Sequence, residues 1–447
     1  MTRPLVPSTS LALFVLSALL ACAEPSSPAD TDAVTSDASS DGGGAPTTTA
    51  SGTQGSTDPA GTDATLTGAD TQDPGSSDGT DAGGDSTGPG VDDTGEPPPP
   101  PSCYRGEGNP AITALASGTW LEVEGSVWRD HCACEDGFPE ACGNGYCTGE
   151  FAYSGAAMSV CHDAVVMWGG GHNDYWGNEV YWLPLDTMQW ERLTDPSDPG
   201  NGCTETYADG TPASRHTYDG LAFIDHAGRL FANGGAIACG EGGAGDGSLW
   251  TFDVGTRTWH DMDPTPTNFD SLDEIAGYFP FNFAADYDPN SGLVYLEANW
   301  GLYAYDFDAN EITFVTNTTP DQGGVWSERT AVVVPDRRLM LSIGGGAVRA
   351  YDLEAGTLEV WQTTGPDAIV TSDAPGLAYD PSHDQVVGWS HGDVFRLDLD
   401  ARTWTADGAP SPVGGAFDVY GRFAYSAVHD AFVAVADPEQ NVAIYRN

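Results

Sequence analysis

Side chains that transfer protons or bind polar ligands stand in short groups along this chain. Histidine and tyrosine can exchange protons, and arginine can bind a carboxylate through paired N–H groups. The groups are His172 with Asp174 and Tyr175, Arg215 with His216 and Tyr218, Trp326 with Glu328 and Arg329, and the single residue His391. Each lies beside an apolar segment typical of a β-strand, so the arrangement of the strands decides whether the groups meet.

The strands belong to a block that recurs at least five times after residue 150. Each block holds an alternating apolar strand, a turn, a strand ending in Gly, a strand with an aromatic residue and Asp, and then Trp. The clearest copies cover residues 164–190 and 229–259. Repetition at a period of about 50 residues predicts a propeller or a similar array.

The block resembles the kelch repeat, whose marks are a Gly pair closing the second strand, an aromatic residue with Asp in the third, and Trp in the fourth. The resemblance implies an all-β, kelch-like β-propeller. First strands are expected to begin near Phe151, His216, Phe281, Glu328, Pro375 and Arg422. This pattern predicts six blades, whereas an open sandwich of similar strands has no reason to repeat at this period.

The last repeat stops after its third strand, at residues 442–445. Residues 118–124 have the character of a fourth strand, with Trp120 at its centre, and no strands of their own before them. We therefore expect this N-terminal strand to close the ring, which removes the open sheet edges that favour aggregation.

Strand direction alternates within a blade, so two kinds of loop should share one face. These are the loops between second and third strands and the links between blades, and we call their side the upper face. All four polar groups should converge there, together with Trp300 and Trp389 as candidates for stacking on a ligand. His172 and His216 could equally hydrogen-bond neighbouring blades and have no ligand.

Three classes of function fit these residues. The first is a binding module that takes a glycan or a protein on its upper face and needs no cofactor. The second is a polysaccharide lyase-like enzyme, in which His172 or His216 accepts a proton, Tyr175 or Tyr218 donates one, and Arg215 or Arg329 neutralises a uronate carboxylate. The third, implied by the likeness to galactose oxidase, is a copper enzyme using His172, His216 and Tyr175. We expect the binding module, with no metal.

The N-terminus has the features of an export signal. Residues 11–20 are apolar but too short to span a membrane, and Leu19-Leu20-Ala21-Cys22 resembles the bacterial lipobox. Residues 1–22 are therefore predicted to be a lipoprotein signal peptide, with Cys22 as the lipidated residue. The absence of Asp after Cys22 predicts an outer-membrane lipoprotein, facing the periplasm or the cell surface. An ordinary secretory signal is the alternative.

Residues 23–102 contain Ser, Thr, Gly, Asp, Pro and Ala without an aromatic or basic residue. Such a segment cannot bury enough apolar surface to offset its ordering entropy, so a disordered acidic linker is predicted there. The propeller is then expected to occupy residues 103–447, including a cysteine-rich segment at 127–150.

Nine cysteines leave an even number once Cys22 carries lipid. In an exported protein this favours disulfides. The expected pairs are Cys203 with Cys239, Cys103 with Cys161, and two local bonds among Cys132, Cys134, Cys142 and Cys147. A zinc site near His131 is the alternative for that cluster, although the Cys132–Cys134 spacing does not match structural zinc sites.

The chain carries a formal net charge of −51, with 15 arginines and no lysine. Such a charge disfavours nucleic acid as a partner and repels polyanions at long range. The acidity could also serve only to keep an exported protein soluble. We expect a monomer.

Overall fold

The computed structural model describes residues 108–135, 137–142, 151–171, 175–200, 204–237, 248–272, 275, 283–298, 300–317, 329–408, 410–414 and 418–447. The chain divides into two compact units, Met1–Val91 and Asp92–Asn447. All described residues belong to the second unit. Cys22 and the predicted linker lie outside the described residues, so the signal, the lipidation and the linker stay predictions.

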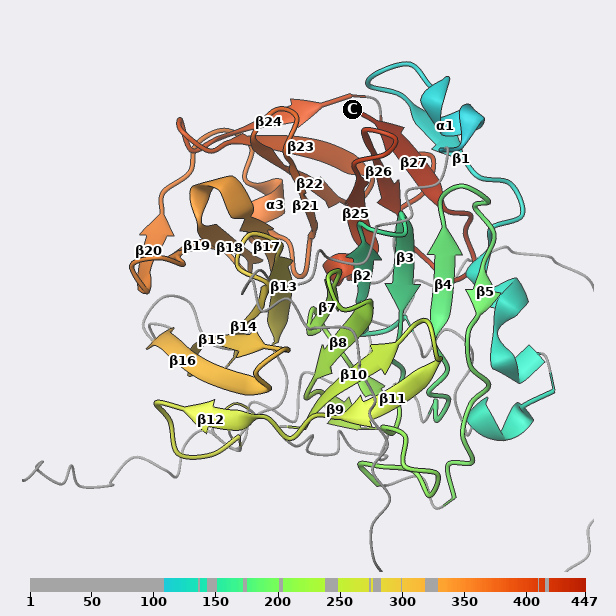
Figure 1. Ribbon diagram of the computed structural model, residues 1–447. Coiled ribbons are helices and arrows are strands. Elements are labelled where there is room, and N and C mark those ends of the chain that lie inside the picture. Colours follow the sequence, from blue (N-terminus) through green and yellow to red (C-terminus); the bar gives the residue numbers. More distant parts are fainter. Residues whose placement is uncertain are drawn as a thin grey trace, which may run out of the picture. The chain divides into compact units, whose positions relative to one another are not determined.

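The second unit is a β-propeller of six blades, each a four-stranded antiparallel sheet (Figure 1). Blades 1 to 3 contain β2 (Ala156–Ser159), β3 (Ala164–Met167), β4 (Tyr181–Pro184) and β5 (Glu191–Arg192); β7 (Leu221–Ile224), β8 (Arg229–Asn233), β10 (Leu249–Asp253) and β11 (Thr258–Asp261); and β13 (Ala284–Asp288), β14 (Leu293–Glu297), β15 (Gly301–Asp306) and β16 (Glu311–Asn317). Blades 4 to 6 contain β17 (Thr330–Val334), β18 (Leu339–Gly344), β19 (Ala347–Asp352) and β20 (Thr357–Trp361); β21 (Gly376–Asp380), β22 (Gln385–Ser390), β23 (Asp393–Asp398) and β24 (Thr403–Asp407); and β25 (Phe423–Ser426), β26 (Ala431–Ala434), β27 (Ala443–Arg446) and β1 (Trp120–Glu122). The predicted six-bladed fold is confirmed.

The first strand of each blade lies innermost and contacts the first strand of the next blade. The sixth blade is closed by β1, which pairs antiparallel with β27 through Trp120 opposite Tyr445 and Leu121 opposite Ile444. The rings of Trp120 and Tyr445 stand 4.9 Å apart. Strand closure from the front of the domain, as the sequence predicted, is confirmed.

Several short elements lie outside the blade sheets. β6 (Arg215–His216) pairs with β9 (Ala236–Ile237), and β12 (Thr265–Thr267) runs parallel to β16. In the part of the chain that the structure describes, the helical elements are α1 (Pro110–Thr113), η2 (Trp128–His131), η3 (Ala133–Glu135), η4 (Pro139–Cys142), η7 (Pro335–Arg337), α3 (Ala368–Thr371) and η8 (Tyr420–Arg422). No helix among the described residues is long and apolar enough to cross a membrane.

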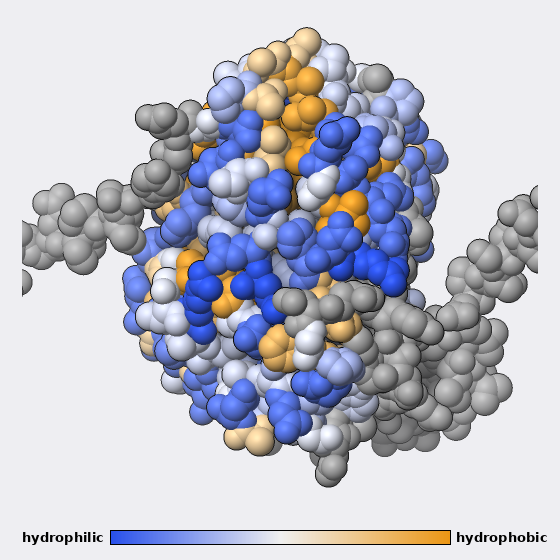
Figure 2. Space-filling view, turned by 90° about the vertical axis from the view of Figure 1, so that its right-hand side faces the viewer, coloured by the Kyte–Doolittle hydropathy of each residue, from blue (hydrophilic) through white to orange (hydrophobic). Residues whose placement is uncertain are grey.

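The hydrophobic core lies between neighbouring blades, because both faces of each sheet pack against another sheet. Trp190 and Trp404, from the fourth-strand position of the repeat, are buried in it. Trp389 is also fully buried and stacks on Phe423 at 6.0 Å, so its predicted role as a stacking platform is wrong. The outer surface seen in Figure 2 is mostly hydrophilic, with separate hydrophobic areas, as the acidic composition requires.

Candidate functional site

Three tyrosines meet at the upper end of the central channel. Tyr153, Tyr218 and Tyr420 each stand three residues before the first strand of blades 1, 2 and 6. All three have left-handed backbone, with φ of 58°, 49° and 49°. Residues other than glycine rarely adopt this conformation, and strained positions of this kind cluster at functional sites. We call these three residues with His216 the mouth cluster.

The rings of the mouth cluster form a continuous aromatic group. The His216 ring stands 5.0 Å from the Tyr153 ring and 5.9 Å from the Tyr218 ring, and the Tyr218 and Tyr420 rings are 6.0 Å apart. The Tyr218 hydroxyl lies 3.4 Å from His216 Nδ1. Tyr218 and Tyr420 are buried, whereas Tyr153 and His216 remain partly exposed. The group therefore presents an aromatic surface above the channel.

Close backbone contacts hold the mouth turns in place. The Tyr218 N–H donates to the Tyr153 carbonyl at 2.7 Å. A Cβ at Gly155 would stand 2.4 Å from the Tyr218 carbonyl oxygen, and one at Gly421 would stand 2.0 Å from that of Ala156. Both positions thus require glycine because the turns of adjacent blades touch there.

Arg422 of blade 6 holds the turn that precedes β2 of blade 1. Its guanidinium donates to the Phe151 carbonyl at 2.9 Å and is fully buried. Burial lowers the pKa of Arg422 to about 10. Sequence reasoning placed a first strand near Phe151, but the strand begins at Ala156, and residues 151–155 form the turn that carries Tyr153.

Two predicted site residues are buried and serve the scaffold. Arg215 is 1% exposed and donates to the carbonyl oxygens of Ala213 and Glu205 at 3.0 and 2.8 Å. The Tyr175 hydroxyl donates to the buried carboxyl of Glu179, whose pKa is raised by burial. Neither side chain faces solvent at the mouth, so the structure does not bring them to the surface that a ligand would reach.

The other predicted residues are divided between the described part of the chain and the rest. His391 is exposed in the turn between β22 and β23, on the upper face. Arg329 is buried directly before β17. His172, Asp174, Trp326 and Glu328 lie outside the described residues, as do Cys103, Cys147, Cys203 and Cys239.

Three cysteines of the described part, Cys132, Cys134 and Cys161, are disulfide-bonded. Cys132 is fully buried beside the blade 1 core, where Trp128 packs against Tyr181 at 5.0 Å. Which cysteines they bond to, including the place of Cys142, stays a prediction.

Below the mouth cluster the central channel holds a cavity of about 500 Å³. Asp219 and Gly421, which directly follow Tyr218 and Tyr420, belong to its lining. Turns between first and second strands line it further down, through Val160, Pro289 and Pro381. The residues that follow two of the tyrosines therefore mark the upper part of the cavity, which extends toward the lower face, the side opposite the upper face.

Carboxylates in the cavity wall accept hydrogen bonds from the backbone edges of the innermost strands. Asp219 accepts from the Ala331 N–H and Asp286 from the Val333 N–H, both at 2.6 Å. Burial, and to a smaller degree the nearby carboxylates of Asp288 and Asp225, raise the pKa of Asp286 to about 7. These side chains satisfy edge groups that no neighbouring strand can reach. They serve the ring itself.

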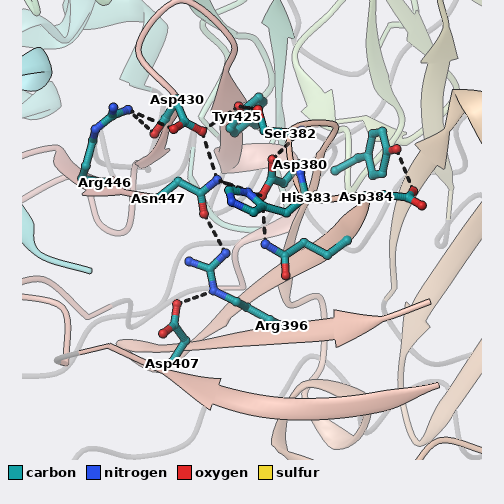
Figure 3. Close-up of polar contacts among 12 residues, drawn as sticks. Asp380, Ser382, His383, Asp384, Arg396, Asp407, Tyr425, Asp430, Arg446 and Asn447 are labelled. Atoms are coloured by element: carbon teal, nitrogen blue, oxygen red, sulfur yellow. Dashed lines mark hydrogen bonds and ion pairs between the residues drawn. The ribbon is translucent and has the colours of Figure 1, made fainter. Parts of the chain in front are cut away.

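Contacts between neighbouring blades tie the lower face together. One such contact joins each pair of neighbouring blades at or near the turns between first and second strands. From blade 1 to blade 4, Asp225 accepts from the Cys161 N–H at 3.0 Å, His226 Nδ1 lies 2.8 Å from the Tyr287 hydroxyl, and Asp288 lies 3.8 Å from Arg338. From blade 4 back to blade 1, Arg337 pairs with Asp384 at 2.6 Å, Asn447 donates to Asp380 at 2.8 Å, and His429 lies 2.9 Å from Asp163. Figure 3 shows the contact between blades 5 and 6, where Asn447 lies among Asp380, Asp430 and Arg396. The polar groups of the lower face are thus largely occupied by structural contacts.

The turns between first and second strands of blades 1, 5 and 6 share a sequence pattern that was not recognised from the sequence. Each has Ser or Asp, two other residues, His and then Asp, at residues 159–163, 380–384 and 426–430. The histidine Nδ1 lies 2.8–2.9 Å from the first side chain of the turn in all three. The pattern is a turn motif and marks the lower face directly from sequence.

No group of three or more His, Cys, Asp or Glu within the described ranges is arranged to hold a metal ion. The carboxylates of the cavity wall accept backbone hydrogen bonds, as described above.

Comparisons with known proteins leave the family open. No family model matches the sequence, and no curated protein matches it. A solved structure, that of a nidogen/laminin complex, is similar with a TM-score of 0.37 and 11% identity, over 57% of this chain and 80% of that chain. The kelch identity of the repeats therefore stays a prediction, and the propeller rests on the sheet topology itself.

Proposed function

We propose that this protein is an envelope-tethered binding module whose upper face takes an extracellular ligand, a glycan in preference to a protein. The observation that carries the proposal is the mouth cluster, in which Tyr153 and His216 present partly exposed rings 5.0 Å apart. Aromatic rings with a polar edge suit stacking against a sugar combined with hydrogen bonding. The rigid scaffold below the mouth cluster supports this use of its loops.

The choice of the upper face is supported by a difference between the polar side chains at the two ends of the channel. On the lower face these groups bridge neighbouring blades. On the upper face, the turns that carry the tyrosines have left-handed backbone, Tyr153 and His216 are partly exposed, and His391 is exposed. The lyase-like alternative has less support, because Arg215 and Tyr175 are buried in structural contacts.

Binding should depend on Tyr153. We expect Tyr153→Ala to weaken binding of the retained ligand about tenfold, the effect of losing one stacking ring. The measurement is retention of the chain from residue 103 onward on an array of neutral and acidic glycans, followed by titration of each hit.

Tyr379→Ala is the matched control, since Tyr379 is a half-exposed tyrosine of the cavity at the lower end, bonded to Asp384 at 2.9 Å. It should leave binding unchanged. If Tyr379→Ala abolishes binding and Tyr153→Ala does not, the ligand occupies the lower cavity and the proposed site is wrong.

Attachment to the envelope is the second part of the proposal and is supported by the Leu-Leu-Ala-Cys sequence ending at Cys22. Full-length protein expressed in a bacterium fed with labelled palmitate should carry the label and sediment with outer membranes. Cys22→Ala should abolish both the label and the sedimentation, because the thiol is the attachment point. Labelled Cys22→Ala protein, or wild type that is released in soluble form, would contradict the anchor.

A further inference from the structure

The cavity of the central channel is lined by the same positions of every blade. The innermost strand of each blade contributes the three residues before its last one, and the turn that follows contributes its first residue. In blade 1 these are Ala156, Ala157 and Met158, with Val160 in the turn. Equivalent residues lie at one level of the channel, so an exceptional residue can be recognised by comparing the blades.

Asp286 of blade 3 is the exception at the middle level. It accepts the Val333 N–H through Oδ2 and the Tyr287 N–H through Oδ1, at 2.6 and 2.8 Å. The other blades close without a carboxylate at this level, and each carries a small apolar residue there: Ala157, Ala222, Val332, Ala378 and Ala424. A carboxylate in an apolar wall costs free energy unless it is well partnered. The propeller architecture therefore does not by itself require Asp286.

Asp219, at the upper end of the cavity, is a buried carboxyl with an unpartnered oxygen. The residue is 3% exposed, and its Oδ2 accepts the Ala331 N–H. Within the part of the chain that the structure describes, Oδ1 accepts no hydrogen bond. Oδ1 lies 3.4 Å from the position that a Cβ on Gly421 would take, and both residues line the cavity. Buried acceptors normally have donors, so Oδ1 lacks a donor that a ligand can supply.

The described lining of the cavity contains carboxyls and no arginine, lysine or histidine. Its acidic residues are Asp219, Asp225, Asp286 and Asp336. Asp225 accepts two backbone N–H groups of blade 1. Burial, and after it the charge of Asp286, raises the pKa of Asp219 well above its ordinary value. The described residues of the wall thus supply no counter-ion to Asp219 and Asp286.

The cavity can be entered from the lower face, and its two carboxyls lie at different depths. Val160 and Pro289, in the turns at the lower end, are exposed. Asp286 is partly exposed although it lies in the channel wall, so solvent reaches it through the cavity. Asp219 pairs with Ala284, two residues before Asp286, which places it about 7 Å higher in the channel. A ligand that enters from below meets Asp286 first.

The wall around the two carboxyls is apolar, which suits an alkyl chain, while ammonium groups suit buried carboxylates. No group of His, Cys, Asp or Glu in the described ranges is arranged to hold a metal ion, so the matching cation is organic. We propose that the cavity is a second binding site, for a short linear diamine whose ammonium groups pair with Asp219 and Asp286. This site does not depend on the binding function proposed for the upper face. The net charge of −51 attracts such a ligand at long range.

Calorimetric titration of the full chain with putrescine tests the site. The buffer contains about 0.15 M salt, which screens the general attraction of cations to an acidic surface. We expect one putrescine per chain, bound at least about tenfold tighter than n-butylamine, which has the same alkyl chain and one ammonium group. Equal affinities for the two amines would overturn a diamine site. Calcium that binds and excludes putrescine would overturn it as well.

Asp286→Ala tests the lower carboxyl and gives blade 3 the residue found at the equivalent position of blades 1, 2, 5 and 6. It should weaken putrescine at least about tenfold and leave n-butylamine nearly unchanged. Asp308→Ala is the matched control, because it removes the same charge from the turn between β15 and β16, where the side chain is 80% exposed. If Asp286→Ala fails to fold, Asp286→Asn keeps an acceptor for Val333 and removes only the charge. Equal losses in the Asp286 and Asp308 variants would overturn the site.

The affinity for putrescine should also rise with pH. The pKa of Asp286 is about 7, and an ammonium group favours the ionised carboxylate, so binding releases protons. The ionisable groups around Asp286 come from blades 2, 3 and 4: Asp219, Asp225, Tyr287, Asp288, Tyr295 and Asp336. Asp286 is about one tenth ionised at pH 6 and about nine tenths at pH 8, so we expect about tenfold tighter binding at pH 8. The same affinity at both values would contradict an ion pair with Asp286.

Discussion

A chain that begins at residue 126, after β1, is expected to lose several kcal/mol of stability and to aggregate. Without β1 the edge of β27 is left unpaired across residues 443–445. The backbone N–H of Val123, which donates to Val442 at 2.9 Å, is lost as well. An exposed edge of this kind is a template for pairing with another chain. The melting temperature should fall by about 10 °C or more.

The comparison is with a chain that begins at residue 103, which lacks the predicted linker and keeps β1. Leu121→Pro in that chain isolates the strand, because proline removes the N–H of a residue paired with Ile444 and so weakens the ladder between β1 and β27. Thermal unfolding followed by circular dichroism, with light scattering, reports both effects. Equal melting temperatures for the chains starting at 103 and 126 would mean that β1 does not close the ring.

The repeat and the closing strand could be predicted because each depends on local pattern. Alternation of apolar residues fixes a strand, the Gly and Trp positions fix the order of strands, and a ring then needs one further strand. The prediction failed for Trp389, which we expected to stack on a ligand at the upper face. Trp389 lies near the end of β22 and is buried against Phe423 of blade 6. Burial at a strand end depends on the neighbouring blade, which one repeat does not reveal.

The candidate site was only partly visible in the sequence. His216 and Tyr218 were placed at the channel mouth, but Tyr153 and Tyr420 were missed. Both adopt a left-handed backbone in a turn, whereas tyrosine in a sequence usually indicates a β-strand. Arg329 was named as a ligand candidate. Its counter-ion Glu297, at 3.3 Å, was not, because that residue comes from another blade, and contacts between blades leave no periodic trace in sequence.

The second large effect is expected where blade 6 meets blade 1 on the lower face. His429 is fully buried, and its Nε2 accepts a hydrogen bond from the Asn109 N–H at 2.6 Å. Nε2 therefore carries no proton, and Nδ1–H faces the Asp163 carboxylate at 2.9 Å. This one imidazole joins the two ends of the ring and the segment that leads into β1.

His429→Leu should cost about 3 kcal/mol, because it leaves the Asp163 carboxylate and the Asn109 N–H buried with fewer partners. The control is His383→Leu at the equivalent turn of blade 5, where the histidine also bonds its turn, to Asp380 at 2.8 Å, but is 57% exposed. That change should cost less than about 1 kcal/mol.

Chemical denaturation of both variants separates the two explanations of the turn motif. If the histidine served only its own turn, the two substitutions would have the same cost. If it closes the ring at blade 6, only His429→Leu would strongly lower the denaturant concentration at the unfolding midpoint. Combining His429→Leu with Leu121→Pro would then cost less stability than the sum of the two single changes, since both residues act on the closure of blade 6. Equal midpoints for His429→Leu and His383→Leu would contradict a closing role for His429.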